Sequence, residues 1–280
     1  SLRMNLAFRR DKYVILANDF FPLSLKYQDR KLSYSLAHLE YVHDDAISPA
    51  MNIWNGLRWK VFMDWNFRIA ESNITGFGDH PNTFNFGFDG RHYLPIYRNI
   101  IWAVRAAGDF SWGTEKFIYY AGGVDNWLFP KFHNENKPDP DYAYAYQSLA
   151  VNLRGFKQNV SNGNNALVLN SEIRAPIFTS FFNKPINNAF LRNFQLVQFF
   201  DLGAAWNGAY DKLERPGVIY GTPPVTVRVK SGGIGPFAGG YGFGARSTIL
   251  GYFLRVDAAW EMNGVFKGKP MWYFAMGLDF

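Results

Sequence analysis

The chain has 280 residues, of which 48% are hydrophobic and an unusually large 19% are aromatic. Its net charge of +6 comes from basic residues scattered among acidic ones, which argues against a nucleic-acid patch. The absence of cysteine excludes a disulfide scaffold and a thiolate metal site. No run of about 18 apolar residues occurs, so we expect no transmembrane helix. The first residues lack a signal-peptide pattern, so we expect a mature or truncated form.

Alternation of apolar and polar side chains predicts strands in the first part of the chain. Residues 2–8, 12–28 and 31–43 show it weakly. In three later segments the charged side chains, such as Lys60 and Arg105, all lie on one face, which is typical of barrel strands with a polar interior and a lipid-facing exterior. The apolar faces of these segments consist of Leu57, Trp59, Val61, Met63, Trp65 and Phe67, of Phe84, Phe86 and Phe88, and of Ile100, Trp102, Val104, Ala106 and Phe110.

A long loop at about residues 113–164 is predicted next, followed by five more strands. In two of these strands, acidic side chains fall on the inward face, namely Glu172 and Asp201. The outward faces consist of Leu167, Leu169, Ile173 and Ile177, of Phe194, Leu196, Phe200, Leu202, Ala204 and Trp206, of Tyr241, Phe243 and Ala245, and of Tyr252, Leu254, Val256, Ala258 and Trp260.

The last predicted strand covers residues 271–280, about the length that a tilted strand needs to cross the hydrocarbon layer. A chain that ends on phenylalanine after such a strand resembles the C-terminal signal of outer-membrane barrels. The bulky apolar face of this strand, which would form the signal, consists of Trp272, Phe274, Met276, Leu278 and Phe280.

The connections between strands alternate between short and long, as they do between the periplasmic and extracellular sides of a barrel. With the short set in the periplasm, tryptophans fall at both rims: Trp65, Trp112, Trp206 and Trp260 at the outer rim, and Trp54 and Trp102 at the inner rim. We therefore predict an all-β fold, a transmembrane antiparallel β-barrel with about ten strands in this chain. The short connections are 96–99, 178–192 and 250–251, and the long ones are 69–82, 113–164 and 207–238.

One motif in the long loop has a specific partner motif further along. Residues 153–156 form an L-R-G-F sequence, which consists of Leu153, Arg154, Gly155 and Phe156. Two strands later, residues 199–203 form an F-x-D-x-G sequence that contains Asp201 and Gly203. A guanidinium inside a barrel needs a carboxylate, and arginine offers a planar fork for bidentate pairing. Gly155 allows a tight turn at the loop tip, Phe156 can pack beneath the loop, and Gly203 leaves room beside Asp201.

These motifs, with five barrel strands behind them, resemble the BamA/TamA superfamily of outer-membrane assembly and translocation proteins. The resemblance implies a sixteen-stranded barrel of which residues 1–280 are the C-terminal portion. It implies a loop that folds into the lumen, where Arg154 pairs with Asp201 near Glu172, with the pair screened by a partly wet lumen. The stretch between Gly123 and Leu153 is longer than is usual in that family and resembles a branch fused to an N-terminal β-propeller.

The resemblance implies a bacterial outer-membrane barrel, not an enzyme, that assists insertion, assembly or translocation of outer-membrane or surface proteins. Its partners would be outer-membrane lipids and client or accessory proteins and lipoproteins, without nucleic acid or cofactor. The alternative is a passive pore or a structural barrel subunit of a larger complex. The histidines, His38, His43, His80, His92 and His133, have no nucleophile that we can place beside them and are too sparse for a metal site, so no catalytic or metal-binding residue is predicted.

Overall fold

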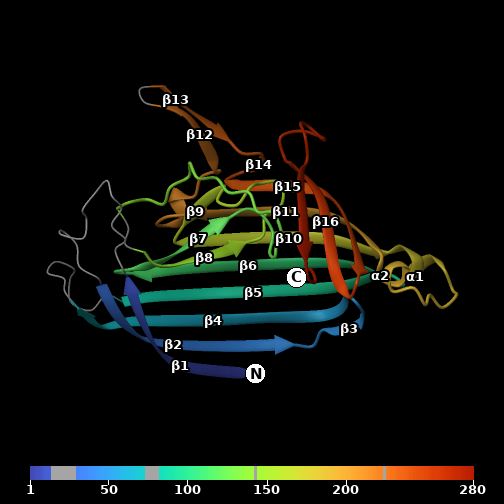
Figure 1. Ribbon diagram of the computed structural model, residues 1–280, viewed down its shortest axis with the longest axis horizontal. Helices are drawn as coiled ribbons and strands as arrows, with labels where there is room; N and C mark the ends of the chain where they lie inside the picture. Colours follow the sequence, from blue (N-terminus) through green and yellow to red (C-terminus); the bar gives the residue numbers. More distant parts are fainter. Residues whose placement is uncertain (14–29, 73–81, 142–143, 223–224) are drawn as a thin grey trace.

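The computed structural model describes residues 1–13, 30–72, 82–141, 144–222 and 225–280 (Figure 1). Almost all of its regular structure is β-strand, which confirms the predicted fold class. Among the described residues, the main antiparallel sheet has twelve strands, ten of them in one continuous path and two short ones at its side, β3 (Ile47–Ala50) and β14 (Gly233–Ile234). The path runs, in order, through β1 (Leu2–Tyr13), β2 (Arg30–Asp44), β4 (Ile53–Ser72), β5 (Asn82–Tyr97), β6 (Ile100–Gly113), β10 (Asn165–Pro176), β11 (Gln195–Trp206), β15 (Phe237–Ile249), β16 (Tyr252–Glu261) and β17 (Met271–Met276).

Tight turns join the strands at one end of the sheet. The predicted short connection at 250–251 is a two-residue turn between β15 and β16, with φ of 51° at Leu250 and 84° at Gly251. Positive φ at both central residues is the conformation whose twist matches that of paired antiparallel strands. A second two-residue turn, at Arg98 and Asn99, joins β5 to β6.

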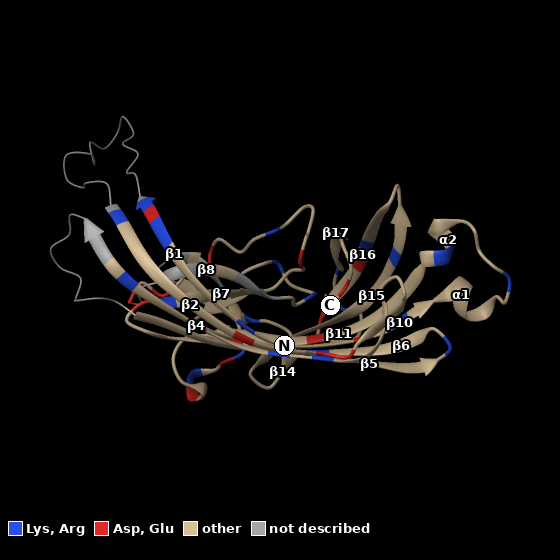
Figure 2. Ribbon diagram, turned by 90° about the horizontal axis from the view of Figure 1, so that it is seen from below, with Lys and Arg blue, Asp and Glu red and all other residues tan. Residues whose placement is uncertain are grey.

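The sheet curves (Figure 2), and the side chains on its two faces differ in polarity. On the concave face, charged and amide side chains are buried: Asn170, Glu172, Arg174, Asp201, Arg246 and Asp257. The convex face exposes large apolar side chains, among them Trp102, Leu169, Ile173, Leu196 and Phe243. This is the reverse of a water-soluble protein, in which ionisable groups face out and apolar ones face in.

The predicted long loop at 113–164 is not irregular throughout. It contains β7 (Lys116–Ala121), β8 (Tyr144–Val151) and β9 (Ser161–Gly163), which form a separate three-stranded sheet. β7 pairs in parallel with β8 and antiparallel with β9. In Figure 2, β7 and β8 lie on the concave side of the main sheet, so the segment 113–164 occupies part of the space that the curved sheet surrounds.

The prediction of a ten-residue C-terminal strand is wrong for its last four residues. β17 stops at Met276, because Gly277 takes a left-handed φ of 108° that takes the chain out of the strand. Residues 277–280 then turn onto the concave side, where Phe280 packs beside Ile53 and Tyr93. The side chain of Phe280 therefore does not continue the outward face of the strand.

The prediction that Ala204 and Trp206 face outward into lipid is also wrong, because the following connection covers them. Leu213 packs on both, and the exposed fraction of Trp206 is 8%. Within the predicted connection 207–238, the described residues form a short 3-10 helix, η2 (Tyr210–Lys212), and a projecting hairpin of β12 (Gly217–Thr222) and β13 (Val225–Lys230).

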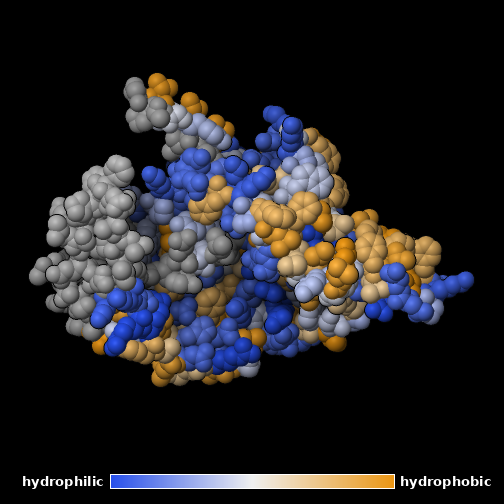
Figure 3. Space-filling view, viewed as in Figure 1, coloured by the Kyte–Doolittle hydropathy of each residue, from blue (hydrophilic) through white to orange (hydrophobic). Residues whose placement is uncertain are grey.

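Between β10 and β11, the predicted connection at 178–192 contains α1 (Ile177–Phe181) and α2 (Ala189–Asn193). Exposed apolar side chains gather over this end of the molecule (Figure 3), among them Phe181, Phe182 and Phe190. In the described part of the chain, no helix has the length and hydropathy needed to cross a membrane. Most of the predicted strand at 12–28, much of the connection 69–82 and His80 lie outside the described residues.

Candidate functional site

The structure places the Arg154 guanidinium on the concave face, against the carboxylate of Asp201 on β11. Arg154 Nε lies 2.6 Å from Asp201 Oδ2, and Nη2 lies 2.8 Å from Oδ1, so the pair is bidentate. The backbone N–H of Arg154 also donates to Asp201, over 3.1 Å. Asn170 on β10 donates a further hydrogen bond to the same carboxylate, over 2.8 Å.

Glu172 completes the surroundings of the guanidinium. Arg154 Nη1 lies 2.6 Å from Glu172 Oε1, and the Arg154 Cζ atom lies 3.7 Å from the centre of the Phe199 ring. Burial disfavours the charged form of arginine, but Asp201 and Glu172 more than offset this effect and raise the pKa of Arg154 well above its usual value. The expectation of a partly wet, screened pair is wrong, because Arg154 and both carboxylates are buried.

The loop tip is fixed to the last strands through its backbone. The Tyr273 hydroxyl on β17 accepts a hydrogen bond from the Gly155 N–H (2.9 Å) and donates one to the Phe156 carbonyl (2.8 Å). Gly155 has a left-handed φ of 101°, as expected for a tight tip. Gly240 on β15 allows the close approach, since a Cβ atom there would lie 1.8 Å from the Arg154 carbonyl oxygen.

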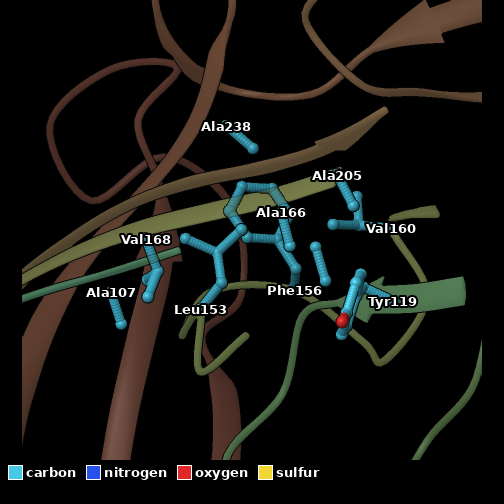
Figure 4. Packing of buried hydrophobic residues seen from close by; sticks show 10 residues of the cluster. Ala107, Tyr119, Leu153, Phe156, Val160, Ala166, Val168, Ala205 and Ala238 are labelled. Carbon is cyan, nitrogen blue, oxygen red and sulfur yellow. The ribbon is translucent and has the colours of Figure 1, made fainter. Parts of the chain in front are cut away.

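Apolar packing holds the two residues that flank this tip (Figure 4). Leu153 and Phe156 belong to a buried cluster with Tyr119 of β7 and with alanine and valine side chains of the main sheet. Leu153 also exchanges backbone hydrogen bonds with Gly123, at 3.0 and 3.1 Å. The L-R-G-F motif is therefore held by apolar contacts on both sides of its buried charge.

A second group of buried charges adjoins the first at the end of the sheet that bears the tight turns. Asp279 lies 2.9 Å from Arg246 and 3.0 Å from Arg255, and Arg246 lies 2.6 Å from Asp257. Arg174 lies 2.8 Å from Glu172 and donates to the Phe280 carbonyl over 2.9 Å. The two groups together contain four arginines, Arg154, Arg174, Arg246 and Arg255, and four carboxylates, Glu172, Asp201, Asp257 and Asp279.

The sequence analysis missed several residues of this site. It gave no role to Asn52, Asn170, Tyr273 or Asp279. The alternation of the last strand puts Tyr273 on the inward face, and this signal could have identified it, because a buried tyrosine hydroxyl requires a hydrogen-bond partner. Gly203 is buried on β11, opposite Val168 and Ala238, and its role beside Asp201 stays a prediction.

The predicted C-terminal signal residues are divided between two environments. Trp272, Phe274 and Met276 are exposed on β17, and Leu278 is exposed in the tail that follows it, whereas Phe280 packs inside. Arg174 contacts Phe280 twice. It donates a hydrogen bond to the Phe280 carbonyl, and the Arg174 Cζ atom lies 5.0 Å from the centre of the Phe280 ring.

Histidine side chains lie beside acidic side chains in the structure. The His38 ring lies 2.5 Å from Asp64, and Asn85 donates to the second oxygen of that carboxylate over 3.2 Å. His43 lies 3.6 Å from Asp45. Among the described residues, no group of three or more histidine and acidic side chains is arranged to hold a metal ion.

Comparison with known proteins gives a distant structural likeness. No protein-family model matches the chain, and no curated protein matches it. Among solved structures, the chain is similar to CdiB from Acinetobacter baumannii, with 14% sequence identity and a TM-score of 0.36. The match covers 98% of this chain and 46% of that chain, so this chain spans about half the length of the structure that it matches.

Proposed function

We propose that the chain is part of the wall of a bacterial outer-membrane β-barrel of the BamA/TamA type. It would assist the insertion, assembly or translocation of outer-membrane or surface proteins and would not act as an enzyme. Its partners would be outer-membrane lipids together with client or accessory outer-membrane proteins and lipoproteins, and not nucleic acid.

The polarity of the sheet supports a membrane location. A curved sheet that exposes Trp102, Leu169 and Leu196 on its convex face and buries arginine and carboxylate on its concave face suits a lipid exterior and a polar interior. The stacked rings of Trp65, Phe84 and Trp112, with centroids 6.1 and 5.9 Å apart, form a ladder across three strands. Aromatic side chains of this kind gather at membrane interfaces.

The observation that carries the proposal is the contact between Arg154 and Asp201. The loop that precedes the last five strands lies inside the curved sheet, and its arginine is bound by carboxylates of the first two of those strands, β10 and β11. A segment held in this way braces the wall from inside and obstructs its interior. A passive pore needs the interior open, so the buried loop favours the assembly function over the pore.

The proposal is tested in cells depleted of the protein and supplied with plasmid-borne variants. We expect depletion to lower the amounts of other outer-membrane or surface proteins in the membrane fraction, and the wild-type chain to restore them. Arg154→Ala should fail to restore them, whereas Arg192→Ala, which removes an exposed arginine of α2, should succeed. Unchanged amounts after depletion, together with steady conductance of the purified protein in a planar bilayer, would favour the passive pore.

A further inference from the structure

The connection between β10 and β11 is much longer than the turns beside it. Two residues suffice to join β5 to β6 and to join β15 to β16, whereas residues 177–194 join β10 to β11 at the same end of the sheet. This connection contains the short helices α1 and α2. Its length therefore builds a structure that closing a turn does not require.

Both neighbouring turns hold the connection in place. Arg98, in the turn between β5 and β6, donates from Nη1 to the Ser180 carbonyl over 2.8 Å. Ser247, near the end of β15, donates from Oγ to the Phe190 carbonyl over 2.7 Å. The two helices are thus bound to the sheet, and the side chains that they expose are held in a defined position.

Four phenylalanine rings form a continuous row along the connection. The centre of the Phe178 ring lies 6.0 Å from that of Phe182 and 5.8 Å from that of Phe194. The Phe190 ring lies 5.9 Å from the Phe194 ring. Phe194 directly precedes β11, on which Leu196 is exposed on the convex face. The row therefore continues the apolar convex face to the end of the molecule.

The outer part of this row is not covered by the described residues. The exposed fractions of Phe181 and Phe182 are 57% and 59%, and Phe190 is exposed as well. These three residues are here called the phenylalanine surface, and they belong to the apolar end of the molecule in Figure 3. Exposed apolar patches of this kind mark sites of contact with proteins or membranes.

The charge beside the phenylalanine surface is positive. Lys184 is exposed between α1 and α2, and Arg98 is exposed in the adjoining turn. Residues 173–200 contain no aspartate or glutamate, and residues 90–108, which include the adjoining turn, contain none either. The surface is therefore complementary to a negatively charged partner.

We propose that residues 177–194 anchor the wall to anionic phospholipids in the periplasmic leaflet of the outer membrane. The phenylalanine surface enters the boundary between headgroups and acyl chains, and Lys184 lies among the phosphate groups. Aromatic and basic side chains bind membrane interfaces in this combination, and anionic lipids attract basic residues near the surface. The row of rings favours lipid over a protein partner, because it continues the face that the proposed function places in lipid. The inference rests on that proposed function.

A fluorescent label at the phenylalanine surface tests this inference. The chain contains no cysteine, so Phe182→Cys gives a single site for a nitrobenzoxadiazole label. Tyr210→Cys, at the opposite end of the sheet, is the matched control, since Tyr210 is also exposed. The full chain is reconstituted into phosphatidylcholine vesicles with and without phosphatidylglycerol, and the quencher is a doxyl group on a lipid acyl chain. Heat-dependent migration on gels verifies that each variant is folded.

We expect the lipid-borne quencher to act severalfold more strongly on the label at position 182 than on the label at position 210. Phosphatidylglycerol should increase the quenching at position 182 further, because it adds negative charge beside Lys184. Lys184→Glu should abolish this increase, whereas Lys230→Glu, which reverses an exposed charge on β13, should preserve it.

Equally weak quenching at the two positions would overturn the inference, because the phenylalanine surface would then lie in water, as expected if a periplasmic protein were its partner. Quenching at position 182 that does not respond to phosphatidylglycerol would overturn it as well, because the surface would not recognise anionic headgroups. Neither result decides the proposed function, which is judged separately by the amounts of outer-membrane proteins in depleted cells.

Discussion

Asn52 and Asp279, 227 residues apart in the chain, bind each other reciprocally. The Asn52 side-chain amide donates to the Asp279 carboxylate over 2.9 Å, and the Asp279 backbone N–H donates to the Asn52 amide oxygen over 2.9 Å. The contact joins the turn between β3 and β4 to the tail that follows β17. It holds two distant parts of the curved sheet together through side chains, where the described strands do not pair.

We expect replacement of Asn52 to loosen this junction. Asn52 has a left-handed φ of 61°, so Asn52→Gly removes the amide while keeping the backbone conformation accessible. The loss should lower the free energy of unfolding by about 1–3 kcal/mol, because the backbone N–H of Asp279 is left without its hydrogen-bond acceptor. Urea unfolding of the protein in detergent micelles measures this effect, and Asn52→Gly with wild-type stability would contradict it.

Removal of either partner of the Arg154–Asp201 pair should be strongly destabilising. Arg154→Ala leaves the buried Asp201 carboxylate without its cation and Glu172 with Arg174 alone, at a cost of about 3–5 kcal/mol. Arg154→Lys keeps the charge but loses the fork, so it should recover only part of this cost. The charge swap of Arg154→Asp with Asp201→Arg should also recover part. A double-mutant cycle by urea unfolding gives the coupling, and additive single effects would mean that the pair is not coupled.

The Tyr273 hydroxyl should keep the loop tip closed to proteases. Tyr273→Phe removes the bonds to the backbone of Gly155 and Phe156, so the tip should open more often. We expect faster tryptic cleavage after Arg154 and Lys157 in the purified variant. Tyr252→Phe, which alters an exposed tyrosine on β16, is the control. Equal cleavage rates in the two variants would assign no role to the Tyr273 hydroxyl.

Gly240→Ala should displace the loop tip, because the added Cβ atom would lie 1.8 Å from the Arg154 carbonyl oxygen. Backbone cannot yield as a flexible side chain does, so we expect a clear loss of stability. Gly90→Ala is the matched control in β5, where the nearest atom to the new Cβ would be 3.8 Å away. Thermal shift in micelles should separate the two variants, and similar melting temperatures would argue against close packing at Gly240.

The long connections should lie outside the cell and the tight turns in the periplasm. Tyr210 and Leu250 are exposed residues at opposite ends of the sheet, with exposed fractions of 71% and 93%. On whole cells, an impermeant maleimide should label Tyr210→Cys but not Leu250→Cys, and both variants should be labelled after lysis. Labelling of Leu250→Cys alone on intact cells would invert the topology.

Local patterns predicted much of the fold because each strand alternates independently of the rest. Period-2 phase placed Glu172 and Asp201 on inward faces, and positive charge on the preceding loop, at Arg154, required a partner there. The two-residue turn at Leu250 and Gly251 followed from the spacing of two alternating segments. The sequence also indicated five strands after the loop, and in the described residues five strands of the main path follow it, β10, β11, β15, β16 and β17.

Contacts between irregular segments could not be predicted in this way. Residues 126–128 show no alternation of apolar and polar side chains, and their place beside β17 depends on how a long loop folds within the sheet. The left-handed conformation of Gly277 ends the last strand early, and alternation alone did not reveal that Phe280 would turn inward. Trp206 has the outward phase expected of a rim residue, but Leu213 covers it from a later segment.

The balance of buried charges limits how the wall could move. If the loop tip withdrew alone, it would carry Arg154 away. The buried Asp201 carboxylate would lose its cation, and Glu172 would keep only Arg174. Lifting the loop together with β10 and β11 breaks none of these ion pairs. Any opening motion of the wall should therefore be a rigid-body displacement of loop and strands, with bending confined to junctions outside this ionic cluster.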